Sequence, residues 1–167
     1  MLRAVMFFAL VSIPAIASAQ HASEPQEDHR VVFAAGWAGE ASRGEGFQPA
    51  GIEGGFEVTP IEGLLSIETT VSVHHGDDGT EVPIEVAFRK PWQVTPTVEF
   101  MAGVAPSLVH AFGAESETFG AVSAGGHFMV WPRPNVGWYV ESAYEVAFPN
   151  RGTQHSVEFA AGILIGR

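Results

Sequence analysis

Alternation between apolar and polar residues at every second position is the feature that most constrains this chain. It recurs in eight segments between Val31 and Gly166, which are separated by clusters of Gly, Pro, Asn and Asp. After Arg30 no helical periodicity of any length appears. A period of two is typical of β-strands, whose successive side chains point to opposite faces. The sequence therefore predicts a single all-β domain over residues 31–167.

Eight strands are predicted, and an even number lets an antiparallel sheet close on itself without a free edge. Their ranges are Val31 to Glu40, Pro49 to Val58, Gly63 to His74, Glu81 to Arg89, Thr97 to Leu108, Thr118 to Val130, Gly137 to Phe148 and His155 to Gly166. Lengths of roughly 9–13 residues suit tilted strands that cross a bilayer. We therefore predict an eight-stranded antiparallel up-and-down transmembrane β-barrel.

The two faces of the predicted strands differ in chemistry. One face is free of charge, and it holds Val31, Phe33, Ala35, Trp37, Ile52, Gly54, Phe56, Val58, Leu65, Ile67, Thr69, Val71, Val73, Val82, Ile84, Val86, Phe88, Val98, Phe100, Ala102, Val104, Val157, Phe159, Ala161, Ile163 and Ile165. The other face mixes carboxylates with Gly, Ala and Ser. Because an eight-stranded barrel has little room inside, small residues beside a few long ones suit its interior. We expect the apolar face to contact lipid.

A soluble fold explains the same alternation if the apolar face turns inward. The alternative hypothesis is therefore a soluble periplasmic β-barrel that binds an apolar ligand. Aromatic residues near the predicted strand ends favour the membrane, since aromatic girdles at the bilayer interfaces are typical of membrane barrels. These residues are Trp37, Trp92, Trp131, Trp138 and Phe148.

The first 19 residues have the features of a secretory signal peptide. Arg3 supplies a positive charge, residues 4–13 form a short apolar run, and Ala17-Ser18-Ala19 gives a small-residue cleavage pattern. The run is shorter than the ~20 residues that a transmembrane helix needs. We therefore expect a signal peptide at 1–19, Sec export to the outer membrane, and a polar periplasmic leader at 20–30.

Composition and motifs narrow the function. The net charge is −11, which disfavours a nucleic-acid partner because phosphate groups would be repelled. The chain has no cysteine, which excludes disulfides and thiolate metal sites. His155 and Ser156 are adjacent on one strand, so they point to opposite faces and cannot act together as base and nucleophile. We predict a non-enzymatic protein without a cofactor or a defined metal site.

The polar face of the predicted barrel is strongly acidic. The predicted lumen cluster comprises Glu53, Glu57, Glu68, Glu85, Arg89, Glu99, His127, Glu141, Glu145 and Glu158. Arg89, His127 and Lys90 are the candidate positive partners, and buried carboxylates without partners are costly. Two interpretations stay open: a lumen that attracts small cations, or a hydrated polar filling held by hydrogen bonds.

A second acidic group lies in one predicted loop, where His74-His75 precede Asp77-Asp78. These residue types can bind a divalent ion. Adjacent histidines on an extended segment diverge, and the spacing matches no defined metal site, so a solvated loop is the favoured interpretation.

In its late segments, Phe128-Met129-Val130-Trp131-Pro132 and Asn135 to Glu141, the chain resembles the small eight-stranded outer-membrane barrel proteins of Gram-negative bacteria, including uncharacterised porin-like envelope proteins. The resemblance extends over residues 31–167. It implies a structural or transport-related role, surroundings of outer-membrane lipid and lipopolysaccharide, and folding by the barrel-assembly machinery. It also implies periplasmic short turns and extracellular loops near Ser42, Asp77, Glu115 and Asn150.

Overall fold

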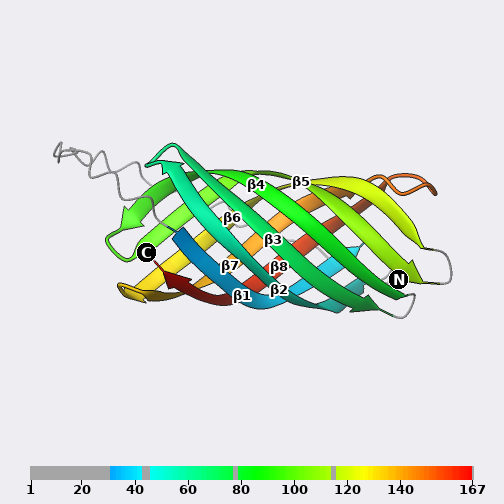
Figure 1. Ribbon diagram of the computed structural model, residues 1–167, viewed down its shortest axis with the longest axis horizontal. Coiled ribbons are helices and arrows are strands. Elements are labelled where there is room, and N and C mark those ends of the chain that lie inside the picture. Colours follow the sequence, from blue (N-terminus) through cyan, green and yellow to red (C-terminus); the bar gives the residue numbers. More distant parts are fainter. Residues whose placement is uncertain (1–30, 43–45, 77–78, 114–115, 167) are drawn as a thin grey trace, which may run out of the picture.

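The structure is a computed structural model that describes residues 31–42, 46–76, 79–113 and 116–166 (Figure 1). The predicted signal peptide and leader lie outside the described residues. So do Asp77 and Asp78, which were half of the predicted loop cluster. No helix long and apolar enough to cross a membrane occurs in the described part of the chain.

Eight strands form the molecule, as the sequence predicted. They are β1 (Val31–Ser42), β2 (Gly46–Ile61), β3 (Leu65–Gly76), β4 (Gly79–Thr95), β5 (Val98–Gly113), β6 (Glu117–Arg133), β7 (Val136–Ala147) and β8 (Gln154–Gly166). Each strand pairs antiparallel with the next along the chain, and β1 pairs with β8 to close the barrel. The register at the closure sets Phe33 opposite Ile165 and Trp37 opposite Ala161.

The apolar stripe of each strand points out of the barrel. Phe33 is 60% exposed, Ile52 70% and Ile163 55%, whereas their polar-face neighbours are buried or half-buried. The soluble alternative needs this stripe in a central core, which is the reverse of what the structure has. The strands of 12 to 17 residues are long enough to cross a bilayer, which takes roughly 9–11 residues.

Four strands, β2, β4, β5 and β6, are longer than the sequence predicted by at least four residues. Pro91 and Trp92 were expected in a turn, but β4 continues to Thr95. Beyond the Ser66–Arg89 pair, β4 has no partner on its β3 side and pairs only with β5. This part of β4 is thus an edge on one side, and edges are among the places where a strand tolerates proline. β6 is also longer than predicted, and it continues through Trp131 and Pro132 to Arg133.

The two ends of the barrel are built differently. The start of β1, the end of β8 and the turns β2–β3, β4–β5 and β6–β7 lie at one end, which we call the terminus side (Figure 1). The turns here are short, and Gly63 adopts a φ of +67° that other residues rarely take. The opposite end, which carries the remaining hairpin connections, is the loop side. Higher positions along the barrel axis are those nearer the loop side.

Candidate functional site

A cluster of apolar side chains lies in the terminus-side half of the lumen, together with the buried polar residues Glu57, Ser66 and Glu99. Val32, Met101, Met129, Tyr139 and Leu164 form a buried cluster, which we call the apolar plug, and none of them is more than 2% exposed. Five different strands, β1, β5, β6, β7 and β8, contribute these side chains. The plug therefore packs side chains from opposite walls of the barrel against one another.

Trp131 belongs to this plug and not to the outer aromatic girdle. It is partly buried and packs against the cluster. The reason is the extension of β6: alternation carries Trp131 to the same side as His127 and Met129. The prediction that Trp131 faces lipid is wrong, whereas Trp37, Trp92, Trp138 and Phe148 are each more than 40% exposed on the outside.

Above the plug, a single arginine bridges the lumen. Arg89 on β4 donates from Nη1 to a carboxylate oxygen of Glu68 and, at 2.5 Å, to Nδ1 of His127. Its Nη2 donates to Oε1 of Glu141 at 2.5 Å. These four residues form the arginine layer. Arg89 is 6% exposed, and its planar, permanently charged group with several donors suits the bridging of two carboxylates.

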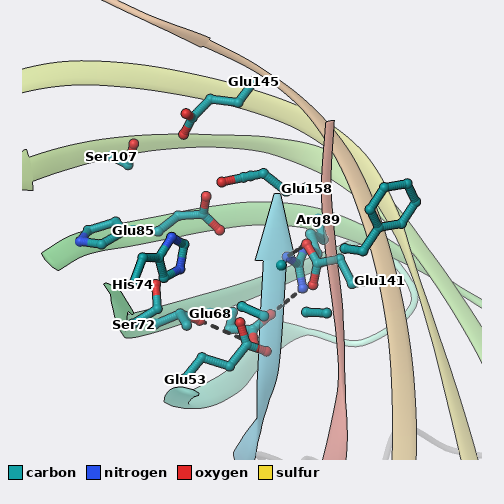
Figure 2. Close-up of a pocket in the computed structure, with 16 residues that line it drawn as sticks. Glu53, Glu68, Ser72, His74, Glu85, Arg89, Ser107, Glu141, Glu145 and Glu158 are labelled. Carbon is teal, nitrogen blue, oxygen red and sulfur yellow. Dashed lines mark hydrogen bonds and ion pairs between the residues drawn. The ribbon is translucent and has the colours of Figure 1, made fainter. Parts of the chain in front are cut away.

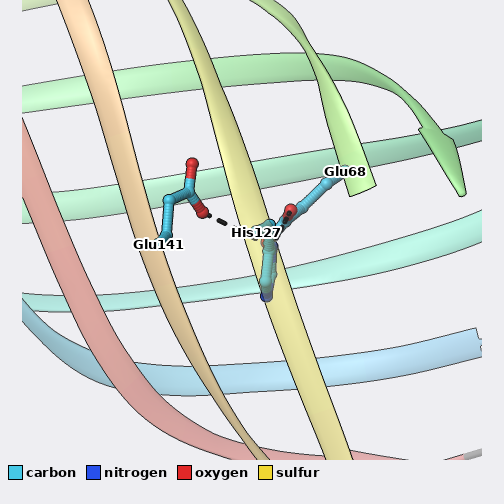
Figure 3. Close-up of side chains that lie close together, drawn as sticks. All are labelled: Glu68, His127 and Glu141. Carbon is cyan, nitrogen blue, oxygen red and sulfur yellow. Dashed lines mark ion pairs between the residues drawn. The ribbon is translucent and has the colours of Figure 1, made fainter. Parts of the chain in front are cut away.

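The arginine layer has the composition of a metal site but is already occupied. Ligand atoms of Glu68, His127 and Glu141 lie within 4.8 Å of one another, and Figure 3 shows the two carboxylates on either side of the imidazole. The guanidinium of Arg89 donates hydrogen bonds to all three. A metal ion would have to stand beside this fixed positive charge, so we interpret the group as an ionic cross-link.

On the loop side of Arg89 the lumen opens into an acidic cavity with an empty volume of about 600 Å³, open solvent included. Its lining includes Ala38, Gly39, Glu53, Glu68, Thr70, Ser72, His74, Pro83, Glu85, Arg89, Ser107, Glu141, Glu145, Glu158, Phe159 and Ala160. Six carboxylates thus face one guanidinium. Figure 2 shows them converging on one space from different strands.

The carboxylates of the acidic cavity are unequally supported. Glu68 and Glu141 are held by Arg89, Glu53 accepts a hydrogen bond from the hydroxyl of Tyr139, and Glu85 accepts one from Ser123 at 3.2 Å. A separate pair lies higher on the wall. Glu145 on β7 and Glu158 on β8 have no hydrogen-bond donor among the described residues, and the register sets them diagonally across adjacent strands.

The structure divides the predicted lumen cluster. Every predicted member is on the inner face, but Glu57, Glu99 and His127 do not line the acidic cavity. Lys90, a predicted positive partner, is on the outside, with its Nζ 5.4 Å from the ring centroid of Trp92. The reason is the period of two: Arg89 points inward, so the next residue cannot.

Several lining residues were not assigned to the site from the sequence, among them the polar residues Ser72, His74 and Ser107. Alternation along β3 would have placed Ser72 and His74 on the face of Glu68. His74 was instead considered with His75 as a loop pair. In the structure His74 faces the acidic cavity. His75 is exposed, and its Nδ1 lies 2.9 Å from Oγ1 of Thr80. The two histidines diverge, as expected.

The adjacent pair His155 and Ser156 also diverges. His155 is exposed, with its Nδ1 2.9 Å from the hydroxyl of Tyr144 on the outer face, and Ser156 is buried inside. The two side chains therefore cannot form a base–nucleophile pair.

Comparison with known proteins bears on the fold. Neither a protein-family model nor a curated protein sequence matches the chain. It is similar in structure to Neisserial surface protein A (NspA), with a TM-score of 0.59 and 16% identity over 83% of this chain and 96% of that chain. The N-terminal β-barrel domain of Pseudomonas aeruginosa OprF gives 0.50 and 8%, over 82% and 98%. The chain thus has the fold of the small eight-stranded outer-membrane barrels.

Proposed function

We propose that this chain is a non-enzymatic outer-membrane barrel whose lumen is closed to ion flow and which acts through its membrane position and its loop-side cavity. Two layers of side chains inside the lumen support the proposal. The apolar plug occupies the terminus side, and the arginine layer crosses the lumen directly above it. An eight-stranded barrel is only just wide enough for its own side chains, so filling at two levels leaves no pore.

The outer surface supports placement in a bilayer. Its exposed apolar side chains would be unfavourable in water over so large a contiguous area. Outer-membrane lipid and lipopolysaccharide would cover this surface, and the barrel-assembly machinery would insert it. The hydroxyl and imidazole of Ser156 and His155 lie on opposite sides of the wall, which supports a role without that hydrolytic chemistry.

Cell fractionation tests the location. The full chain with its own first residues is expressed in a Gram-negative host, and we expect it in the outer-membrane pellet with heat-modifiable mobility on gels. Release with the periplasmic fraction on osmotic shock would contradict the proposal.

Recording from planar bilayers tests the closure. Folded protein inserted in the bilayer is expected to add no stepwise conductance above the lipid baseline. Heat-modifiable mobility of the same sample shows that the inserted protein is folded. Reproducible single-channel steps from that sample would show an open lumen and overturn the proposed closure.

A further inference from the structure

We propose that the acidic cavity binds a small organic cation with two or more ammonium groups, such as a diamine or a polyamine. This inference rests on the proposed closed barrel, because a lumen blocked below Arg89 makes the cavity a dead-end pocket with one mouth. It goes beyond that function by naming a ligand class and the residues that would hold it.

The first argument is the charge of the cavity. Six carboxylates and one guanidinium line the cavity. Arg89 donates its hydrogen bonds to Glu68, Glu141 and His127. Glu145 and Glu158 receive no hydrogen bond from any described residue. Carboxylates held close together away from bulk water are costly unless a positive group comes between them. The missing component of this cavity is therefore a cation.

The second argument is independent of charge. Ser72 is only 8% exposed, lines the cavity, and has no hydrogen-bond partner among the described residues. Nε2 of His74 and Oγ of Ser107 are buried and also lack partners. Figure 2 shows these three side chains around the same space as Glu85 and Glu145. Unsatisfied buried polar atoms in a native structure call for a missing partner.

The spacing of the groups selects the kind of cation. Among the described residues, the only His and carboxylate atoms close enough to share one metal ion are those of Glu68, His127 and Glu141, where Arg89 already lies. The remaining carboxylates come from separate strands around the wall: Glu53 from β2, Glu85 from β4, Glu145 from β7 and Glu158 from β8. Metal ions need compact ligand sets. Ammonium groups joined by a carbon chain can reach separated carboxylates, and each donates three hydrogen bonds.

The position of the cavity suits a ligand from outside the cell. Its lining comes from the late part of β1, β3 and β7 and the early part of β4 and β8, which is the loop side. In the orientation that the resemblance to outer-membrane barrels implies, with the short turns in the periplasm, the loop side faces away from the periplasm. A cleft with one sign of charge and low-dielectric walls concentrates the field and attracts cations to its mouth.

Calorimetric titration of the folded full chain in a zwitterionic detergent tests the inference. Spermidine, putrescine and Mg²⁺ are titrated at constant ionic strength. We expect saturable one-to-one binding of spermidine and putrescine, and much weaker binding of Mg²⁺. Loss of a charge-assisted hydrogen bond in Glu158→Gln should weaken spermidine binding by roughly tenfold or more. Ser72→Ala should weaken it by a few fold.

Glu62→Gln is the matched control, because Glu62 is exposed in the turn at the terminus side. It removes the same charge from the opposite end, and binding should not change. Absence of saturable heat would mean that the cavity holds only water, and equal responses to Mg²⁺ or equal losses in both glutamate variants would mean general charge screening. Each result overturns the inference but leaves the closed barrel intact, since only bilayer conductance tests that. Heat-modifiable mobility verifies that every variant is folded.

Discussion

The two halves of the lumen follow the same alternation and have opposite chemistry. On the terminus side, Met101, Met129 and Leu164 are almost completely buried in an apolar cluster. On the loop side, the same inward positions carry Glu85, Glu145 and Glu158 around an open cavity. Apolar packing is the main feature of the first half, whereas the second half places six carboxylates around one cavity. The comparison indicates that packing in the terminus-side half stabilises the barrel, whereas the loop-side half is available to bind a ligand.

Arg89 lies on the border between the halves, and its loss should have the largest effect. Arg89→Met leaves Glu68 and Glu141 buried without a counter-charge, and breaking such a buried pair costs about 3–5 kcal/mol. Urea unfolding in lipid vesicles, followed by tryptophan fluorescence, measures the change.

Lys90→Met is the matched control, since the neighbouring side chain is exposed on the outside. It should change the unfolding free energy by less than about 1 kcal/mol. Similar losses in both variants would mean that Arg89 is not the bridge between the halves.

The plug should be more sensitive to truncation than the lipid-facing surface at the same level. Leu164 is 1% exposed, while its neighbour Ile163 faces outward. Leu164→Ala opens a void in the plug and should cost roughly 2–5 kcal/mol, because packed neighbours only partly collapse into it. Lipid can fill the space left by Ile163→Ala, so that loss should be smaller. If Ile163→Ala lowered the unfolding free energy more than Leu164→Ala, the packed core would not lie at the plug.

Neutralising the acidic half should stabilise the barrel. Glu158→Gln keeps the shape of the side chain and removes repulsion from Glu145, a gain on the order of 1 kcal/mol. The sign is the informative quantity, because a substitution that lowers stability is the ordinary outcome. A clear loss of unfolding free energy would show that Glu158 has a structural partner.

Two serines on β3 provide the finest comparison. Ser66 is on the terminus side and donates to the carbonyl of Val58 at 3.4 Å, whereas Ser72 has no such partner. Ser66→Ala should cost about 0.5–1.5 kcal/mol, and Ser72→Ala less than about 0.5 kcal/mol. Equal losses of unfolding free energy in the two variants would mean that the hydrogen bond of Ser66 does not distinguish it from Ser72.

Much of the fold was predictable because a period of two assigns faces without knowledge of distant contacts. Phe33, Ile67 and Phe100 were correctly separated from Glu68 and Glu99 on this basis. Strand ends were less predictable, since Pro91 and Pro132 were taken as breaks. Whether proline ends a strand depends on whether the neighbouring strand extends that far, and this is a property of the register.

The site was predictable as a set of residues but not as an arrangement. Alternation placed the glutamates inside, but the level of each along the axis depends on strand stagger. The sequence therefore could not show that Glu57 and Glu99 are separated from the cavity. Nor could it show that Arg89 on β4 bridges Glu68 on β3 and Glu141 on β7. Ser72 and His74 were accessible in principle, because they share the face of Glu68.

Thiol labelling tests the division of the lumen most directly. The chain has no cysteine, so Ser66→Cys and Ser72→Cys each introduce one thiol on the same face of β3. A cationic and an anionic methanethiosulfonate of similar size are applied to the folded protein in vesicles. The account predicts that Ser72→Cys reacts with the cationic reagent roughly tenfold faster or more than with the anionic one, and that Ser66→Cys reacts with neither. Equal reaction of both positions with both reagents would contradict it.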